Sequence, residues 1–91
     1  MHNLRYSASF KKGFKKTKRN PRFILFEFEQ IISDLINGKS LDKRYQNHKL
    51  HGEWKSCYEC HLAPDILFIY EINNEENIIY MHRIGSHSEL F

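Results

Sequence analysis

The sequence predicts a small α+β domain in which an N-terminal strand and a helical hairpin pack on a small antiparallel sheet, in the order β-α-α-β-β-β. Apolar residues recur at helical spacing in the first half of the chain, and three segments rich in aromatic and β-branched residues follow in the second half. With 91 residues, of which 41% are hydrophobic, the chain fits one domain, residues 1–91, with one packed core.

The chain begins with a predicted strand and a predicted helix. Residues 3–7 alternate as a short strand does, with Leu4 and Tyr6 on one side. Phe10 and Phe14 then stand four residues apart among lysines. This spacing favours a helix that turns one aromatic edge inward and leaves its basic face in water.

A second helix should follow and complete a helical hairpin. Asn20-Pro21 indicates its start, because Asn is a good N-cap and Pro is favoured at the first helical position. Apolar residues then recur at helical spacing over 24–35, and Asn37-Gly38 is a suitable stop.

The second half of the chain predicts a long loop and three strands. Residues 39–53 are polar and lack a sustained period, so they indicate a loop, which contains His48 and His51. Strands are expected over 54–62, 65–72 and 77–85, joined by antiparallel turns at 63–64 and 73–76.

The charge is distributed unevenly. Eight of the 14 Lys and Arg residues and none of the 11 Asp and Glu residues precede Glu27. A concentrated basic face is typical of proteins that bind nucleic acid or a strongly acidic protein, although it can also be merely a solvated helix face. The candidates for RNA contacts are Lys11, Lys12, Lys15 and Lys16.

No segment predicts a membrane protein. The longest uncharged apolar run, residues 66–70, is far below the roughly 20 residues of a membrane span, and residues 1–22 are too charged for a signal peptide. The expected location is the cytoplasm.

Side-chain parity sorts the polar groups of the strands. In 54–62, Trp54 and Cys60 should share one face, while Glu59 and His61 share the other, which is the expected solvent face. Asp65 should lie close to His61 across the tight turn. In the last strand Ile79, Met81, Arg83 and Gly85 share a face, and Arg83 joins Glu59 and His61 only if the register permits.

This face, rimmed by His48 and His87, has the groups that RNA cleavage without a metal ion requires. A base must take the proton of a ribose 2′-hydroxyl, an acid must protonate the departing 5′-oxygen, and a cation must stabilise the phosphoryl oxygens. Histidine suits both proton transfers and Arg binds phosphate with two parallel donors. Six histidines in a small basic protein could equally be ordinary surface groups.

The cysteines offer a different motif, Cys57-x-x-Cys60-His61, which matches the signature of covalent haem attachment. Residues three apart on a strand point to opposite faces, so the two sulfurs do not present themselves together. A zinc site of Cys57, Cys60 and two histidines fails for the same reason. We expect Cys60 to pack in the core on the Trp54 face, and we expect no cofactor and no metal.

Three segments of the second half resemble a known family. They are HKLHGEWK at 48–55, ECHLAPD at 59–65 and RIGSHSELF at 83–91. In order and spacing they are similar to the H-x-L-x-G-x-W, acidic-x-H-x-x-P-D and R-x-G-[ST]-H-x-x-L-F segments of the YafQ-like mRNA interferase toxins, in the RelE/ParE toxin superfamily. The resemblance covers about half of the chain, and the predicted helical hairpin lies where the family has its own.

The resemblance implies a RelE-like fold and the toxin of a type II toxin–antitoxin pair, an endoribonuclease that is neutralised by a cognate antitoxin. The acid–base groups and Arg83 predict that it needs no metal ion. Its substrate would be mRNA, which many members cut on the translating ribosome. By position, the family's acid–base residues correspond to His48, His61, Asp65 and His87, its acidic position to Glu59, its phosphate-binding arginine to Arg83 and its terminal aromatic to Phe91.

Each correspondence has a simpler alternative. His48 could order its loop, Asp65 could be a turn residue, His87 could cap the C-terminal segment, and Phe91 could hold the tail in the core. His51 and His82 match no family motif and are expected to be surface or packing residues. A YafQ-type toxin has tryptophan directly after the aspartate where Ile66 stands here, so any stacking role is lost or has moved to Phe91 or Tyr58.

Two other functions are compatible with the same fold. ParE-like members of the superfamily poison DNA gyrase, and a non-catalytic RNA-binding module would need only the basic patch and exposed aromatic platforms. Neither needs several acid–base groups on one sheet face, whereas a nuclease does. The histidines therefore favour the ribonuclease.

Overall fold

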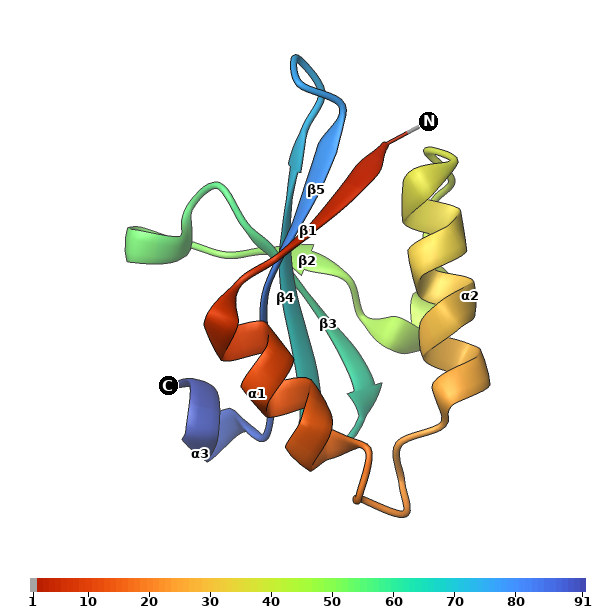
Figure 1. Cartoon of the computed structure of the whole chain (residues 1–91), viewed down its shortest axis with the longest axis vertical. Helices are drawn as coiled ribbons and strands as arrows, with labels where there is room; N and C mark the ends of the chain where they lie inside the picture. The colour runs from red at the N-terminus through yellow and green to blue at the C-terminus, as the bar shows by residue number, and fades with distance from the viewer. Residues whose placement is uncertain (1) are drawn as a thin grey trace.

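A computed structural model describes residues 2–91 of the chain as a five-stranded sheet with helices on both faces (Figure 1). The strand order is β1-β5-β4-β3-β2, with β1 parallel to β5 and the other pairs antiparallel. The helices, the short 3₁₀ helices η1 and η2, and the strands are β1 (Asn3–Tyr6), α1 (Ala8–Thr17), α2 (Leu25–Ile36), η1 (Lys43–Tyr45), β2 (His48–Lys49), η2 (Gly52–Trp54), β3 (Tyr58–Ala63), β4 (Ile66–Asn73), β5 (Ile78–Gly85) and α3 (His87–Leu90).

Helix α1 directly follows β1, the strand at one edge of the sheet. Ser7 caps it, because its hydroxyl accepts from the Phe10 amide at 2.9 Å and donates to the carbonyl of His82 on β5 at 2.6 Å. Gly13 then brings the helix backbone against β5, since a Cβ at this position would lie 2.3 Å from the carbonyl oxygen of Ile84. Only glycine permits this close approach.

Helix α2 begins at Leu25 rather than at Asn20-Pro21, so the predicted start was wrong. The Asn20 side chain accepts from the amide of Arg22 at 2.9 Å, and its carbonyl accepts from the amide of Phe23 at 3.0 Å. Asn20 therefore stabilises a turn, which is the common alternative to an N-cap for this residue type. The predicted end is confirmed, with Asn37 as the C-cap.

The main core lies between the sheet and the two long helices. The rings of Phe10 and Phe28 pack on Phe68 of β4 with centroids 5.9 and 5.2 Å apart, in edge-on geometry. The buried members of this core are Phe10, Phe28, Ile31, Leu35, Tyr45, Cys60, Ile66, Phe68, Tyr70, Ile79, Met81 and Ile84. The predicted core position of Cys60 is confirmed.

The opposite face of the sheet is covered only in part. Leu67 and Ile69 of β4 pack there with Cys57 and Leu90, beside Trp54 and Leu50. Figure 1 shows α2 on one side of the sheet, and α3 and the loop that contains η2 on the other. The uncovered part of this face carries the polar side chains that the sequence singles out.

Two predictions about residues 39–62 were wrong. The expected loop contains β2, which adds a fifth strand to the sheet. Trp54 lies in η2 and not in a strand, and it packs on the face opposite to Cys60. The cause is a local excursion: the Leu50 amide donates to the Cys57 carbonyl at 2.9 Å, and the chain between them turns through Gly52 at φ 69°.

Within residues 2–91 the helices fall short of the length and apolar character that crossing a bilayer would take.

Candidate active site

A row of functional side chains crosses the sheet face opposite to α2, which we call the site face. The register pairs His48 of β2 with Glu59 of β3, Glu59 with Ile69 of β4, and Ile69 with Arg83 of β5. Residues paired directly across strands project from the same face. His48, Glu59 and Arg83 therefore share one line, and His61, two positions after Glu59, lies on the same face.

Arg83 reaches this face through a β-bulge. The pairing of β5 with β4 shifts at His82, since Ile69 pairs with Arg83 but Tyr70 pairs with Met81. Met81 consequently points into the main core while His82 and Arg83 both belong to the opposite face. The parity assignment that grouped Arg83 with Ile79 and Met81 was therefore wrong, because one extra residue reverses the alternation.

The Glu59 carboxylate lies between two histidines. Its Oε1 is 3.3 Å from Nε2 of His48 and 3.6 Å from Nε2 of His61. The two imidazole centroids are 6.0 Å apart. Glu59 is only 7% exposed, so the expectation that it faces solvent was wrong. Because it is buried, the two imidazoles lie beside the carboxylate in place of water.

This trio is arranged for proton transfer. His48 Nδ1 lies 2.8 Å from the carbonyl oxygen of Gln46, so it donates there and turns Nε2 toward Glu59. A carboxylate held against an imidazole fixes the ring orientation and stabilises the positive charge that develops when the ring accepts a proton. His48 and His61, each with Glu59, can therefore serve as base or acid.

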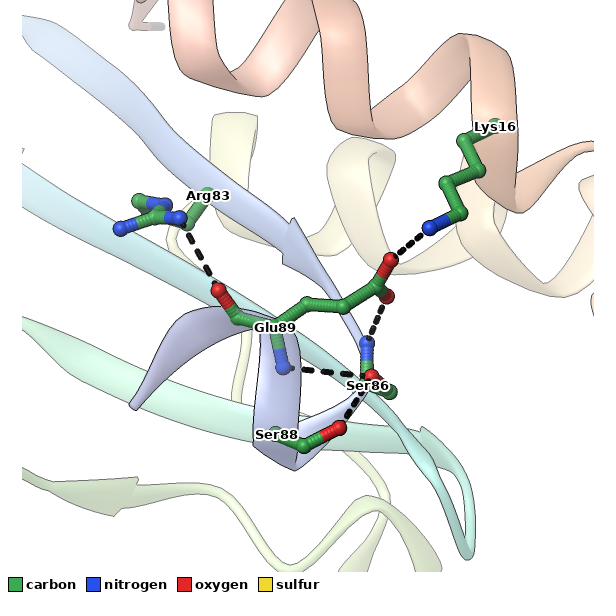
Figure 2. Close-up of polar contacts among 5 residues, drawn as sticks. All are labelled: Lys16, Arg83, Ser86, Ser88 and Glu89. Atoms are coloured by element: carbon green, nitrogen blue, oxygen red, sulfur yellow. Dashed lines mark hydrogen bonds and ion pairs between the residues drawn. The ribbon is translucent and has the colours of Figure 1, made fainter.

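Helix α3, which carries His87, is anchored by a polar network (Figure 2). In a capping box, the Glu89 amide donates to the Ser86 hydroxyl at 3.3 Å and the Ser86 amide donates to the Glu89 carboxylate at 2.8 Å. Lys16 of α1 pairs with the same carboxylate, and Arg83 donates to the Glu89 carbonyl at 3.3 Å. The hydrogen bond from Lys16, followed by those from Ser86, lowers the pKa of Glu89 to about 2.

The C-terminal side chains His87 and Phe91 are exposed, on the side of the sheet against which Leu90 of α3 packs. His87 is exposed, and its ring packs on Phe91 with centroids 5.2 Å apart. Phe91 is 54% exposed, which contradicts the alternative that it plugs the core. Tyr58 packs against the main core beside Tyr70, so it is not available on the site face as a stacking platform. Ile66 is buried in the same core.

Asp65 has a charge partner outside the trio. Its carboxylate is 3.7 Å from Nη1 of Arg22, and within residues 2–91 it makes no ion pair with His61. It borders a small cavity of about 130 Å³ together with Lys16 and Ser86. The structure thus places Asp65 at the end of the sheet near α3, on the side of the α1–α2 connection.

A basic groove of about 550 Å³ lies between α1, the end of β5 and α3. Four of the predicted RNA-binding residues border it, Lys12, Lys15, Lys16 and Arg83, together with Arg19, for which no RNA contact was predicted. Lys11 borders instead a more apolar cavity of about 730 Å³ between α1 and α2, which Lys15 also reaches. The helix therefore divides its basic residues between two sides.

Among residues 2–91, two sets of three side chains have donor atoms within 4.8 Å of one another and could hold a metal ion: His48, Glu59 and His61, and Cys57, Glu71 and His82. The second set was not predicted. It depends on the bulge at His82 and on the η2 excursion before Cys57, neither of which has a signature in the alternation of the sequence. The α3 capping box was also missed, although Ser86-x-x-Glu89 is a recognisable signal for it.

Comparison with known proteins supports one family over the whole chain. The family model described as the bacterial toxin of a type II toxin–antitoxin system, YafQ, matches residues 2–91. An mRNA interferase toxin YafQ of Escherichia coli K12 is 27% identical over 90 residues, which cover 98% of this chain and 95% of the relative. A Haemophilus influenzae protein named as a YafQ toxin is 32% identical over 88 residues, covering 92% and 86%.

The fold agrees with solved structures of such toxins. A metal-bound toxin from Helicobacter pylori superposes with a TM-score of 0.91 at 37% identity, covering 100% of both chains. YafQ in the E. coli DinJ–YafQ complex superposes with a TM-score of 0.84 at 28% identity, covering 100% of this chain and 99% of the other. The predicted α+β, RelE-like fold is confirmed. The chain therefore belongs to the YafQ family of bacterial toxins of type II toxin–antitoxin systems.

Proposed function

We propose that this toxin is an endoribonuclease that cleaves mRNA in the cytoplasm without a metal ion and is neutralised by a cognate antitoxin. The E. coli relatives are named mRNA interferases, and E. coli YafQ forms a complex with DinJ, which is described as a toxin–antitoxin complex. The observation that carries the proposal is the row of His48, Glu59 and Arg83 across one sheet face, with His61 beside it.

The proposed reaction begins at the trio. A histidine held by Glu59, either His48 or His61, accepts the proton of a ribose 2′-hydroxyl. The 2′-oxygen then attacks the adjacent phosphorus, and the bond from phosphorus to the 5′-oxygen breaks. His87 gives its proton to that oxygen. The products are a 2′,3′-cyclic phosphate and a 5′-hydroxyl.

Arg83 and the basic groove hold the phosphates in this proposal. Arg83 donates one N–H group to the Glu89 carbonyl. Its guanidinium has further donors that can bind the phosphoryl oxygens as their negative charge grows. The lysines of the groove bind the flanking backbone without reading its sequence. Phe91 offers an exposed ring on which a base can stack. Whether the RNA is free or on the ribosome does not alter these roles.

Metal binding at the trio would oppose this chemistry. A relative from H. pylori is described as metal-bound, and the donor atoms of His48, Glu59 and His61 are close enough to hold a divalent cation. Such a cation would supply Lewis acidity. It would also occupy the nitrogens that have to carry protons. We therefore expect a metal ion bound by the trio to inhibit RNA cleavage.

The buried carboxylate favours a nuclease over the other two functions. Burying a charged group costs free energy unless partners compensate it. Neither gyrase binding nor passive RNA binding requires a charge beneath two imidazoles. An enzyme that moves protons does require it.

The test is cleavage of a single-stranded mRNA by purified His87→Ala, with His51→Ala as the matched control. His51 is exposed and lies outside the row. Loss of a positioned proton-transfer group typically lowers a rate about 10²- to 10⁴-fold. We expect that loss for His87→Ala only, with an unchanged circular dichroism spectrum and unchanged antitoxin binding. If folded His87→Ala cleaves and arrests growth like the parent, the acid must be sought in His48 or His61.

A further inference from the structure

A second cluster of chemically reactive side chains lies one row along the strands from the proposed active site. Glu71 of β4 is two positions after Ile69, and His82 precedes Arg83 in the bulge of β5. Glu71 Oε1 is 3.0 Å from His82 Nε2 and 3.9 Å from Cys57 Sγ. All three donor atoms lie within 4.8 Å of one another.

We propose that Cys57, Glu71 and His82 form a zinc-binding site that is separate from the proposed catalytic residues. A thiolate, an imidazole and a carboxylate are the three ligand types that bind Zn²⁺ in proteins, at about 2.0 to 2.3 Å. Tetrahedral coordination at those bond lengths separates neighbouring ligand atoms by about 3.3 to 3.6 Å. The two separations from Glu71 Oε1, 3.0 and 3.9 Å, bracket this range, and the third is within 4.8 Å, so rotations of the side chains can bring the three atoms to these distances.

The fold orients these ligands and leaves a route for the cation. The His82 ring is held between Trp54, which approaches edge-on, and Tyr80, which stacks on it, with both centroids 6.1 Å away. The side chains of Glu71 and His82 are 30% and 29% exposed, whereas Cys57 is 3% exposed. The cation can therefore enter from solvent past the carboxylate and imidazole and meet the sulfur beneath them.

The thiol is protonated before the cation binds. Burial, and then the negative charge of Glu71, raise the pKa of Cys57. Binding a cation would release this proton and form a metal–sulfur bond, as it does for other cysteine ligands. An ion pair between Glu71 and His82 alone would account for those two residues but not for a sulfur directed at the same carboxylate.

Occupation of the site would tie the η2 loop to β4 and β5 at the bulge that places Arg83 on the site face. This role is structural and does not depend on the proposed nuclease activity. It can be separated from metal binding at the trio because His48, Glu59 and His61 contain no sulfur. A thiolate–metal bond therefore reports on the second site alone.

The test is titration of the reduced, purified toxin with Co²⁺ as a spectroscopic substitute for Zn²⁺. We expect about one equivalent of Co²⁺ to produce a thiolate-to-cobalt charge-transfer band that Zn²⁺ abolishes. The band should persist in His48→Gln and in Cys60→Ala, whose sulfur lies in the main core. It should disappear in Cys57→Ser. Glu71→Gln and His82→Gln each remove a metal ligand itself. Removal of a residue that only supports a ligand typically lowers metal affinity about 10- to 100-fold, so the affinity for Co²⁺ should fall by more than that.

The partly exposed positions Glu71 and His82 keep the test valid if Cys57→Ser does not fold. The proposal is overturned if stoichiometric Co²⁺ gives no thiolate band in the parent protein. It is equally overturned if the band survives in Cys57→Ser, or if folded Glu71→Gln and His82→Gln bind Co²⁺ as tightly as the parent.

Discussion

At the scale of single residues, Glu59 determines the character of the proposed site. It is a carboxylate with 7% exposure, and its Oε1 faces His48 at 3.3 Å and His61 at 3.6 Å. In this environment the carboxylate can orient both rings and offset the charge of either one after protonation. We therefore regard Glu59 as a positioning residue that acts through the histidines.

Glu59→Gln should keep the shape of the side chain and remove its charge. We expect cleavage of RNA to slow by at least about 10²-fold, because the imidazolium formed in the reaction loses its counter-charge. The pH–rate profile should also change, which a purely structural role would not cause. Glu53→Gln, at an exposed position in η2, is the control. A folded Glu59→Gln with the parent's rate and pH profile would contradict the assignment.

The sheet face on which each side chain lies was predicted correctly wherever the strand alternation was regular. Parity placed Glu59 and His61 together and Cys60 in the core. It failed at Arg83, since the bulge at His82 inserts one residue into the alternation. It also failed to show that Glu59 is buried, because the burial of a charged residue depends on partners from β2 that the sequence pattern does not reveal.

At the scale of elements, α3 is the segment whose position the proposed mechanism needs most. It has only four residues, too few to be stable as an isolated helix. Leu90 packs it on the sheet, and the network of Lys16, Ser86 and Glu89 holds its first turn, as Figure 2 shows. The position of His87 thus depends on these contacts.

Glu89→Gln should weaken this anchor in a pH-dependent way. The pKa of Glu89 is lowered to about 2, so its stabilising effect is full above the ordinary carboxyl pKa of about 4.3 and is lost as the pH falls toward 2. The ion pair is exposed, which limits the effect to about 1 kcal/mol or less. Urea midpoints of parent and variant should differ at pH 6 and converge near pH 2.

Glu75→Gln, in the exposed turn before β5, controls for the change in net charge. A difference between the parent and Glu89→Gln that persisted undiminished at pH 2, or was matched by Glu75→Gln, would mean that the capping network does not carry the effect.

Helices and strands were predicted well where hydrophobic periodicity was sustained, and poorly where individual hydrogen bonds determined the backbone conformation. The long strands β4 and β5 and the end of α2 agree with the sequence within one or two residues. Asn20 stabilised a turn where an N-cap was expected. The two-residue strand β2 exists only through its pairing with β3, a contact that no pattern within residues 48–49 encodes.

At the scale of the whole molecule, several of the basic residues that are concentrated early in the sequence line one groove. The basic residues of α1 lie on two sides of the helix, and only one side borders Arg83. The sequence predicted a polyanion-binding helix but could not say which of its lysines share a surface with the site. That division depends on the docking of α1 against β5 at Gly13.

Removing basic residues from each side should therefore have different effects. Lys12 and Arg19 border the groove, whereas Lys11 and Lys18 border the other cavity. Each lost contact with a single-stranded phosphate lowers the slope of log affinity against log salt by about 0.7. We expect Lys12→Ala with Arg19→Ala to weaken RNA binding and flatten this slope, and Lys11→Ala with Lys18→Ala to change neither. Equal effects of the two pairs in a filter-binding titration would show that the groove is not the RNA path.

In the mechanism that we propose, one sheet face of this toxin cleaves RNA by proton transfer through its own side chains. The most direct measurement is incubation of the purified toxin with a single-stranded RNA in EDTA, followed by mass spectrometry of the fragments. We expect cleavage to continue and to leave 2′,3′-cyclic phosphate and 5′-hydroxyl ends. Cleavage that stops in EDTA and returns only with Mg²⁺ or Zn²⁺, or fragments that carry 3′-hydroxyl and 5′-phosphate ends, would contradict it.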